Sequence, residues 1–220
     1  MRSSEEIIHR IREPEGEPAG ALILSHGRGS DENDLFGLLD ELDPERRLLG
    51  VTTGAPLTGV APGGRHWYLV PRVGHPDPRT FAHSYELLSG FIDRLLAERS
   101  IDPSRTVLGG FSMGAVMSYA TALGEGRPNP AGVIAMSGFL PTVEGWSPAV
   151  AERVGLPVLI AHGTRDPVIE FGFADRAAAL LEPAGLDVRR VSTETGHWVD
   201  PAAVDAAREL VADVLAAPRG

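Results

Sequence analysis

The sequence predicts an α/β fold with a mostly parallel central sheet and helices on both faces. First, short apolar runs typical of strands alternate with longer segments whose apolar residues recur at helical spacing. Second, the strand-like runs are apolar throughout, as expected for strands buried on both sides. Third, 220 residues with 43% hydrophobic content suit one domain, which we expect to span 1–220.

The expected elements alternate along most of the chain. Strands are expected at 20–27, 47–56, 105–112, 131–139, 156–164 and 187–196, and helices at 81–100, 113–126, 173–185 and 200–217. Asp200 suits the N-cap of the last helix and Pro201 its first position, whereas Pro183 and Gly185 end the preceding one.

One connection, 55–80, is unusually long and rich in Gly and Pro. Connections of this length are usually functional or disordered. This one carries Trp67 and Tyr68, which favours a function in substrate binding. The alternative is a surface loop tied down by its own aromatic residues.

Composition excludes several classes of function. The net charge of −10 argues against nucleic acid as a partner, because phosphate binding needs a basic surface. The basic residues are all Arg, and without Lys there is no Schiff-base or P-loop chemistry. The chain has no Cys and therefore no disulfide or thiolate site. It also has no apolar run long enough for stable membrane insertion, and its charged first residues lack a signal-peptide core, so we expect a cytoplasmic protein.

The pentapeptide from Gly110 to Gly114 has the pattern G-x-S-x-G and joins an expected strand to an expected helix. In a nucleophile elbow this turn exposes the serine hydroxyl, and the glycines prevent side-chain collisions. Ser112 is therefore the candidate nucleophile. The alternative is an ordinary turn serine that caps the following helix.

An acid and a base follow the serine in the chain. Asp166 lies just past the strand at 156–164, and His197 lies between the last strand and the last helix. A neutral His there can take the proton of Ser112 while the acid orients its ring. The alternatives are a turn Asp before Pro167, with Glu170 as the acid, and a His that packs under the last helix. The spacing of the remaining histidines does not suggest a metal site.

The segment "SHGRGSDENDL" follows the first expected strand. A His-Gly-x-Gly turn there can aim backbone N–H groups at an oxyanion, and the N–H of Met113 would be the second donor. Ser30 or Asp31 can also cap a helix that begins in this segment, and both interpretations can hold together.

The segments "LSHGRGSDENDL", "GGFSMGAVMSYA", "AHGTRDPVI" and "GHWVDP" together resemble the carboxylesterase/phospholipase family of α/β-hydrolases. That family includes small bacterial carboxylesterases and enzymes similar to acyl-protein thioesterases. The resemblance implies the α/β-hydrolase fold without a large cap domain, and a triad of Ser112, Asp166 and His197. It also implies oxyanion donors at the backbone amides of Arg28 and Met113.

We therefore expect a serine hydrolase that cleaves carboxylic esters or thioesters of small to medium acyl groups, without a cofactor or metal. Two alternatives stay open: an acyltransferase or perhydrolase on the same triad, and a small-molecule receptor with a hydrolase fold. Apolar residues of the 55–80 loop could equally form a homodimer contact. Candidate substrate-binding residues are Trp67, Tyr68, Phe139, Leu140, Phe171 and Trp198.

Overall fold

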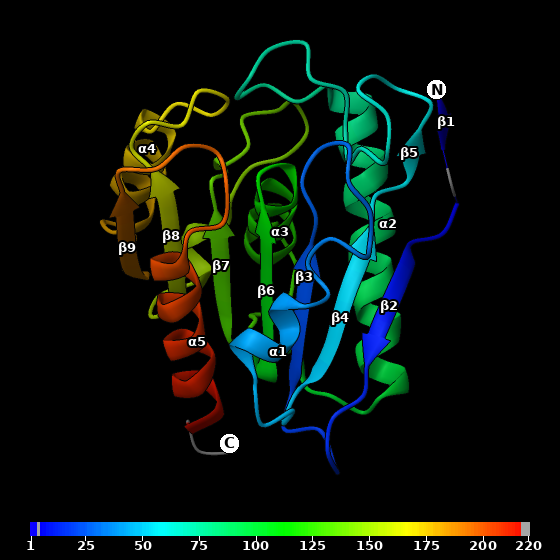
Figure 1. Cartoon of the computed structure of the whole chain (residues 1–220), viewed down its shortest axis with the longest axis vertical. Coiled ribbons are helices and arrows are strands. Elements are labelled where there is room, and N and C mark those ends of the chain that lie inside the picture. The colour runs from blue at the N-terminus through cyan, green and yellow to red at the C-terminus, as the bar shows by residue number, and fades with distance from the viewer. Residues whose placement is uncertain (4, 217–220) are drawn as a thin grey trace.

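One seven-stranded, mostly parallel sheet forms the centre of the computed structural model, which describes residues 1–3 and 5–216 (Figure 1). The strand order is β2-β4-β3-β6-β7-β8-β9, and β2 pairs antiparallel with β4 at one edge. The strands are β2 (Ile8–Arg12), β3 (Ala21–Ser25), β4 (Leu49–Gly54), β6 (Thr106–Phe111), β7 (Gly132–Met136), β8 (Pro157–Gly163) and β9 (Asp187–Thr193). A separate two-stranded pair joins β1 (Arg2–Ser3) to β5 (Leu57–Thr58).

Helices cover both faces of the sheet, which confirms the predicted fold (Figure 1). One face is covered by α2 (Pro78–Glu98), α3 (Met113–Leu123) and α4 (Gly172–Leu181), and the other by α1 (Leu38–Leu42) and α5 (Pro201–Ala216). Neighbouring strand residues divide between the two cores: Leu108 packs with the first set of helices and Val107 with the second. No helix of the described part of the chain is long and apolar enough to cross a membrane.

Helix boundaries follow from local capping. The α2 helix starts before the expected residue 81, because the Asp77 carboxylate accepts a hydrogen bond from the Thr80 amide (2.9 Å) and Pro78 fits the first turn. The helix that we expected to begin near Ser30 or Asp31 is short and begins later in the chain. The Asp31 carboxylate closes a turn with the Asn33 amide (2.8 Å), and α1 begins only at Leu38.

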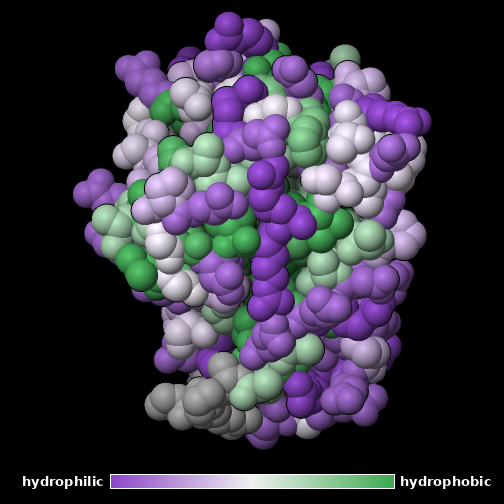
Figure 2. Space-filling view, turned by 90° about the vertical axis from the view of Figure 1, so that its left-hand side faces the viewer, coloured by the Kyte–Doolittle hydropathy of each residue, from purple (hydrophilic) through white to green (hydrophobic). Residues whose placement is uncertain are grey.

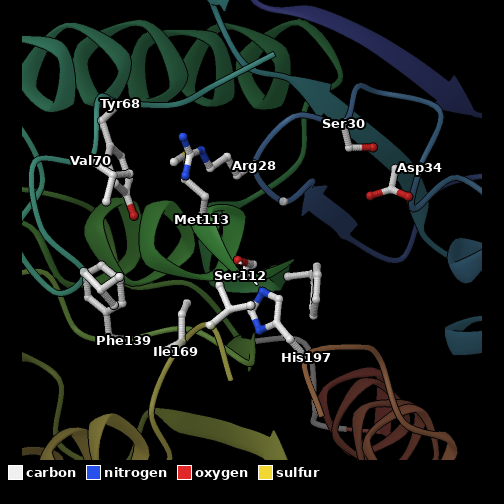
Figure 3. A pocket seen from close by; sticks show the side chains of 14 residues that line it. Arg28, Ser30, Asp34, Tyr68, Val70, Ser112, Met113, Phe139, Ile169 and His197 are labelled. Carbon is white, nitrogen blue, oxygen red and sulfur yellow. Dashed lines mark hydrogen bonds between the residues drawn. The ribbon is translucent and has the colours of Figure 1, made fainter. Parts of the chain in front are cut away.

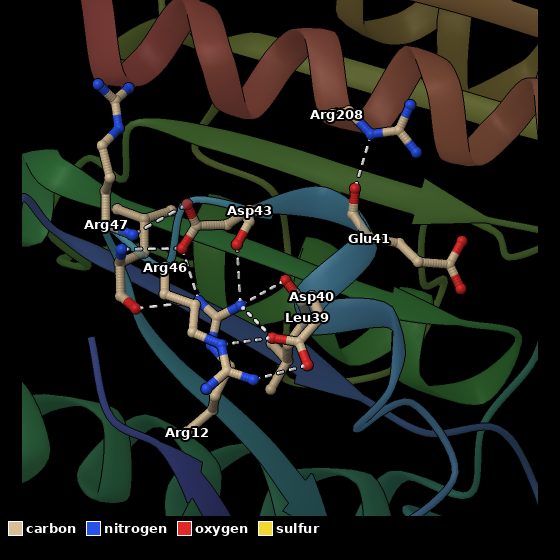
Figure 4. A network of polar contacts seen from close by, with 9 residues as sticks. Arg12, Leu39, Asp40, Glu41, Asp43, Arg46, Arg47 and Arg208 are labelled. Carbon is tan, nitrogen blue, oxygen red and sulfur yellow. Dashed lines mark hydrogen bonds and ion pairs between the residues drawn. The ribbon is translucent and has the colours of Figure 1, made fainter. Parts of the chain in front are cut away.

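A buried ion pair joins three elements near the start of β4 (Figure 4). The Arg12 guanidinium, at the end of β2, lies 2.6 Å from the Asp43 carboxylate just after α1, and both side chains are almost fully buried. Arg12 also donates to the carbonyls of Leu39 (2.6 Å) and Leu48 (3.1 Å). A side chain at Gly50 would meet Arg12 Nε at 2.9 Å, so glycine leaves the room that this ion pair needs.

Strand β9 forms the other edge of the sheet and is only half-buried. Arg189 pairs with Asp213 of α5 (2.7 Å), and Arg190 pairs with Asp175 of α4. The molecular face on this side carries hydrophilic side chains between apolar patches (Figure 2). Charged side chains along an exposed edge oppose pairing with a strand of another molecule.

Candidate active site

Ser112 lies at the sharp turn between β6 and α3. Its backbone has φ 54° and ψ −117°, in the region that non-glycine residues seldom adopt, and its amide donates to the Met136 carbonyl (2.8 Å). A Cβ on Gly114 would lie 1.9 Å from the Ser25 carbonyl oxygen, and one on Gly110 would lie 2.7 Å from the same atom. Both positions therefore require glycine, as the pentapeptide predicts.

Three strand ends bring Ser112, Asp166 and His197 together (Figure 3 shows the serine beside the histidine). His197 Nε2 lies 2.9 Å from Ser112 Oγ, and His197 Nδ1 lies 2.6 Å from Asp166 Oδ2. The residues follow β6, β8 and β9, whose carboxyl ends meet at the same edge of the sheet. The Phe111 ring packs against the His197 ring, with centroids 4.9 Å apart.

The Asp166 carboxylate is held ionised. Burial alone would raise its pKa, but hydrogen bonds from the His197 ring and from the Ile169 and Val168 amides outweigh burial, so the pKa lies below its ordinary value. The two amide bonds are both 2.8 Å long and occupy Oδ1, which leaves Oδ2 for the imidazole. An ionised carboxylate only accepts hydrogen bonds, so His197 Nδ1 carries the proton and Nε2 is free to accept one from Ser112.

Other acids and bases near this site have different surroundings. Glu170, the alternative acid, is exposed, and the hydrogen bond to His197 comes from Asp166. His162 Nε2 donates to the Ile169 carbonyl (2.8 Å) and holds the turn that positions Asp166. No group of three or more metal-binding side chains occurs among residues 1–3 and 5–216.

Two backbone amides beside Ser112 have no acceptor within the described chain: those of Arg28 and Met113. The glycine turn that carries Arg28 pairs with the long loop, since Gly29 donates to the Arg65 carbonyl and Arg65 donates to the Ser30 carbonyl (both 2.9 Å). Two N–H groups held in this way are suited to bind a developing oxyanion.

His26 and Trp67 fix the same turn from below. His26 Nδ1 donates to the Gly27 carbonyl (2.6 Å), and its Nε2 accepts from the Ala55 amide (3.0 Å), which sets the tautomer. Burial lowers the pKa of His26, so the ring stays neutral. The Trp67 indole N–H donates to the His26 carbonyl (3.0 Å), and the Trp67 amide approaches Met113 Sδ at 3.2 Å.

A cavity of about 280 Å³ opens above Ser112 (Figure 3). Of the expected substrate-binding residues, Tyr68 and Phe139 line it. Trp67, Leu140, Phe171 and Trp198 are not among its lining residues. Trp67 is fully buried beneath the turn that carries Arg28, whereas Trp198 is 55% exposed. Phe171 packs edge-on against His162, and Leu140 packs against the core.

Sequence reasoning missed much of the cavity wall. Additional lining residues come from the loop at 69–76, from the Asp166 turn and from the turn after β3: Val70, Val73, Val168, Ile169, Ser30 and Asp34. Proximity in sequence to Asp166 could have indicated Val168 and Ile169. The valines of the long loop carry no local signal, because only the folded path of the loop brings them over Ser112.

Residues 7–215 match the model of a family described as Phospholipase/Carboxylesterase. The chain belongs to this family. It is 28% identical to acyl-protein thioesterase 1 of Debaryomyces hansenii over 89% of this chain and 91% of that protein. It is 30% identical to acyl-protein thioesterase 1 of Emericella nidulans over 90% and 92% of the two chains.

Solved structures agree with the family's fold. The structure of esterase PE8 has a TM-score of 0.81 at 24% identity and covers 95% of this chain and 99% of its own. The Bacillus cereus carboxylesterase has a TM-score of 0.80 at 22% identity and covers 94% of each chain. As a member of this family, the protein is a carboxylic ester hydrolase of the esterase and thioesterase type.

Proposed function

We propose that this enzyme hydrolyses esters and thioesters of short to medium acyl groups through an acyl-enzyme on Ser112. The observation that carries the proposal is the continuous chain of hydrogen bonds from Ser112 Oγ to His197 and on to Asp166. Each bond has the direction that base catalysis needs: the hydroxyl donates to Nε2, and Nδ1–H donates to an ionised carboxylate.

In acylation, Ser112 Oγ attacks the carbonyl carbon as His197 Nε2 takes the hydroxyl proton. The carbonyl oxygen becomes an oxyanion that accepts hydrogen bonds from the amides of Arg28 and Met113. When the bond to the leaving group breaks, His197 returns the proton to the departing oxygen or sulfur. The products of this half-reaction are an alcohol or thiol and an ester on Ser112.

Deacylation repeats these steps with water. Neutral His197 takes a proton from water, the hydroxide attacks the acyl carbonyl, and the same two amides hold the oxyanion. Collapse releases the carboxylic acid and returns the proton to Ser112 Oγ. Asp166 stays ionised throughout and stabilises the imidazolium that forms in each step.

The cavity sets the substrate size. At about 30 Å³ for each water-sized unit, 280 Å³ holds roughly nine non-hydrogen atoms. That volume accommodates a short acyl group with part of its alcohol, and a palmitoyl chain would extend into solvent. The mainly apolar wall, with Val70, Phe139 and Ile169, suits hydrocarbon. The thioesterase names of the relatives support thioesters as substrates beside oxygen esters.

Hydrolysis of p-nitrophenyl esters from acetate to palmitate tests this proposal. We expect the highest kcat/KM at four to six acyl carbons, roughly the range that the cavity volume allows. Ser112→Ala should lower kcat by at least on the order of 10⁴-fold and abolish labelling by a fluorophosphonate. Ser147→Ala, an exposed serine away from the cavity, is the matched control. Activity that persists in Ser112→Ala would refute the serine mechanism.

A further inference from the structure

The Arg28 side chain enters the cavity as an unpaired cation. Its Nη2 donates to the Ala61 carbonyl (3.0 Å), and no carboxylate of the described residues lies within the 4 Å of an ion pair. A guanidinium has five N–H donors, so most of its capacity stays free. In Figure 3 the guanidinium turns toward the Tyr68 side of the cavity, away from Asp34. Arg28 is the one arginine among the described lining residues.

The Tyr68 hydroxyl is a second unused donor in the same cavity. Tyr68 is only 1% exposed, yet its hydroxyl has no hydrogen-bond partner in the described part of the chain. The ring descends into the cavity with the oxygen at its tip (Figure 3). Burial raises the pKa of Tyr68, so the group stays protonated and able to donate. The oxygen is not among the fully buried atoms that lack a partner, so it opens onto the cavity, where an acceptor on a ligand can reach it.

These two donors lie in a wall that is otherwise mainly apolar on this side, with Val70, Phe139 and Ile169. We propose that Arg28 and Tyr68 form an anion subsite and that the preferred substrates carry a carboxylate close to the scissile ester. The proposal rests on the proposed function, because it places this carboxylate relative to an ester held at Ser112. A guanidinium and a hydroxyl match the two acceptor oxygens of a carboxylate.

An uncharged, fully apolar substrate would offer no acceptor to the Tyr68 hydroxyl or to the free N–H groups of Arg28. A carboxylate would satisfy them with charge-assisted hydrogen bonds, which are roughly twice as strong as neutral ones. Because Arg28 is exposed to solvent, its contribution is moderated by screening. We therefore expect each of the two groups to change substrate selectivity by about tenfold rather than by several orders of magnitude.

Two pairs of substrates test the subsite and locate the carboxylate. On the acyl side, the mono-p-nitrophenyl ester of adipic acid is compared with p-nitrophenyl hexanoate. On the alcohol side, 4-carboxyphenyl butyrate is compared with its methyl ester. The measured quantity is the ratio of kcat/KM for the charged to the uncharged member, in which changes common to both substrates cancel. The wild type should favour the charged member in one pair, and that pair identifies the side.

Arg28→Gln and Tyr68→Phe should each lower this ratio by about tenfold. Arg28→Gln keeps the backbone N–H of residue 28. Arg72→Gln is the matched control, because Arg72 is an exposed arginine on the loop that borders the cavity but does not line it. Arg72→Gln removes the same positive charge as Arg28→Gln, and we expect it to leave the kcat/KM ratio unchanged. This comparison distinguishes a direct contact of Arg28 with the carboxylate from an effect of the protein's net charge. Ratios that Arg28→Gln and Tyr68→Phe leave unaltered in both pairs would overturn the proposal.

Binding to inactive protein separates this inference from the proposed mechanism. Calorimetry with adipate on Ser112→Ala should show binding that weakens about tenfold when Arg28→Gln is added. If Ser112→Ala retains hydrolysis while the arginine dependence of binding persists, the mechanism fails and the subsite stands. If Ser112→Ala is inactive and adipate binding does not depend on Arg28, the mechanism stands and the subsite fails.

Discussion

Replacement of Trp67 by Phe should weaken both the fold and the proposed oxyanion turn. The substitution removes the indole N–H that donates to the His26 carbonyl (3.0 Å) within a fully buried site. An unpaired buried carbonyl costs about 1–3 kcal/mol, and the missing ring atoms add about 1–2 kcal/mol. The sum, about 2–5 kcal/mol, corresponds to a Tm lowered by roughly 4–20 °C for a chain of this length.

The kinetic effect follows from the position of that carbonyl. His26 precedes the turn that carries the Arg28 amide, so a looser turn aims this donor less well. Loss of a whole oxyanion donor costs on the order of 10²–10³ in kcat, and we expect a misaligned one to cost about tenfold. The assay is kcat on a butyrate ester well below the Tm, together with thermal unfolding followed by circular dichroism.

Trp146→Phe provides the matched control. Trp146 is half-buried, and its indole nitrogen is buried without an acceptor among the described residues. The same truncation there breaks no hydrogen bond, so we expect a loss below about 1 kcal/mol and no change in kcat. If Trp67→Phe and Trp146→Phe change the Tm and kcat of the wild type by equal amounts, the hydrogen bond from Trp67 to the His26 carbonyl does not hold the turn, and this reasoning is wrong.

The remaining predictions concern pH, the buried ion pair and the elbow. Burial lowers the pKa of His26 from 6.5, so as the pH falls the unfolded chain binds a proton before the folded chain does. The free energy of unfolding should therefore decrease as the pH is lowered from about 6.5, by at most about 1.4 kcal/mol per pH unit. Urea unfolding between pH 8 and pH 5 measures this decrease, which should be smaller in His26→Gln. Arg12→Met should cost about 3–5 kcal/mol in urea unfolding, because Asp43 stays buried without its cation, and equal stability would contradict this. Gly114→Ala should lower the Tm and abolish activity, whereas Gly37→Ala, with open space around its Cα, should do neither.

The central strands and the long helices could be predicted because each carries its own pattern of apolar residues, which indicates a buried strand or an amphipathic helix. The expected strand at 105–112 is β6 (Thr106–Phe111), and the expected strand at 156–164 is β8 (Pro157–Gly163). Edge strand β2 could not be predicted in this way. Its sequence is charged and its side chains are mostly exposed, so only pairing with β4 makes Ile8–Arg12 a strand.

The proposed catalytic residues could be predicted from the sequence, whereas most of the cavity wall could not. Ser112, Asp166 and His197 each follow a strand, so the sheet alone brings them together once the strand order is given. The candidate substrate-binding residues lie mostly on loops, where an aromatic side chain can pack into the core as well as contact a ligand. Trp67 and Tyr68 are neighbours in the sequence, yet Trp67 supports the turn and Tyr68 faces the cavity.

The long connection thereby links the proposed chemistry to the choice of substrate. A Cβ on Gly64 would lie 2.0 Å from the Gly29 carbonyl oxygen, so the loop backbone packs directly on the turn that carries Arg28. From there the chain passes through Trp67, beneath the turn, and reaches Val70 and Val73 on the cavity wall. Substitutions at 69–76 can reshape the wall while Trp67 and the glycine contact keep the turn in place. Selectivity should therefore vary more readily in this segment than the rate of the common chemical steps.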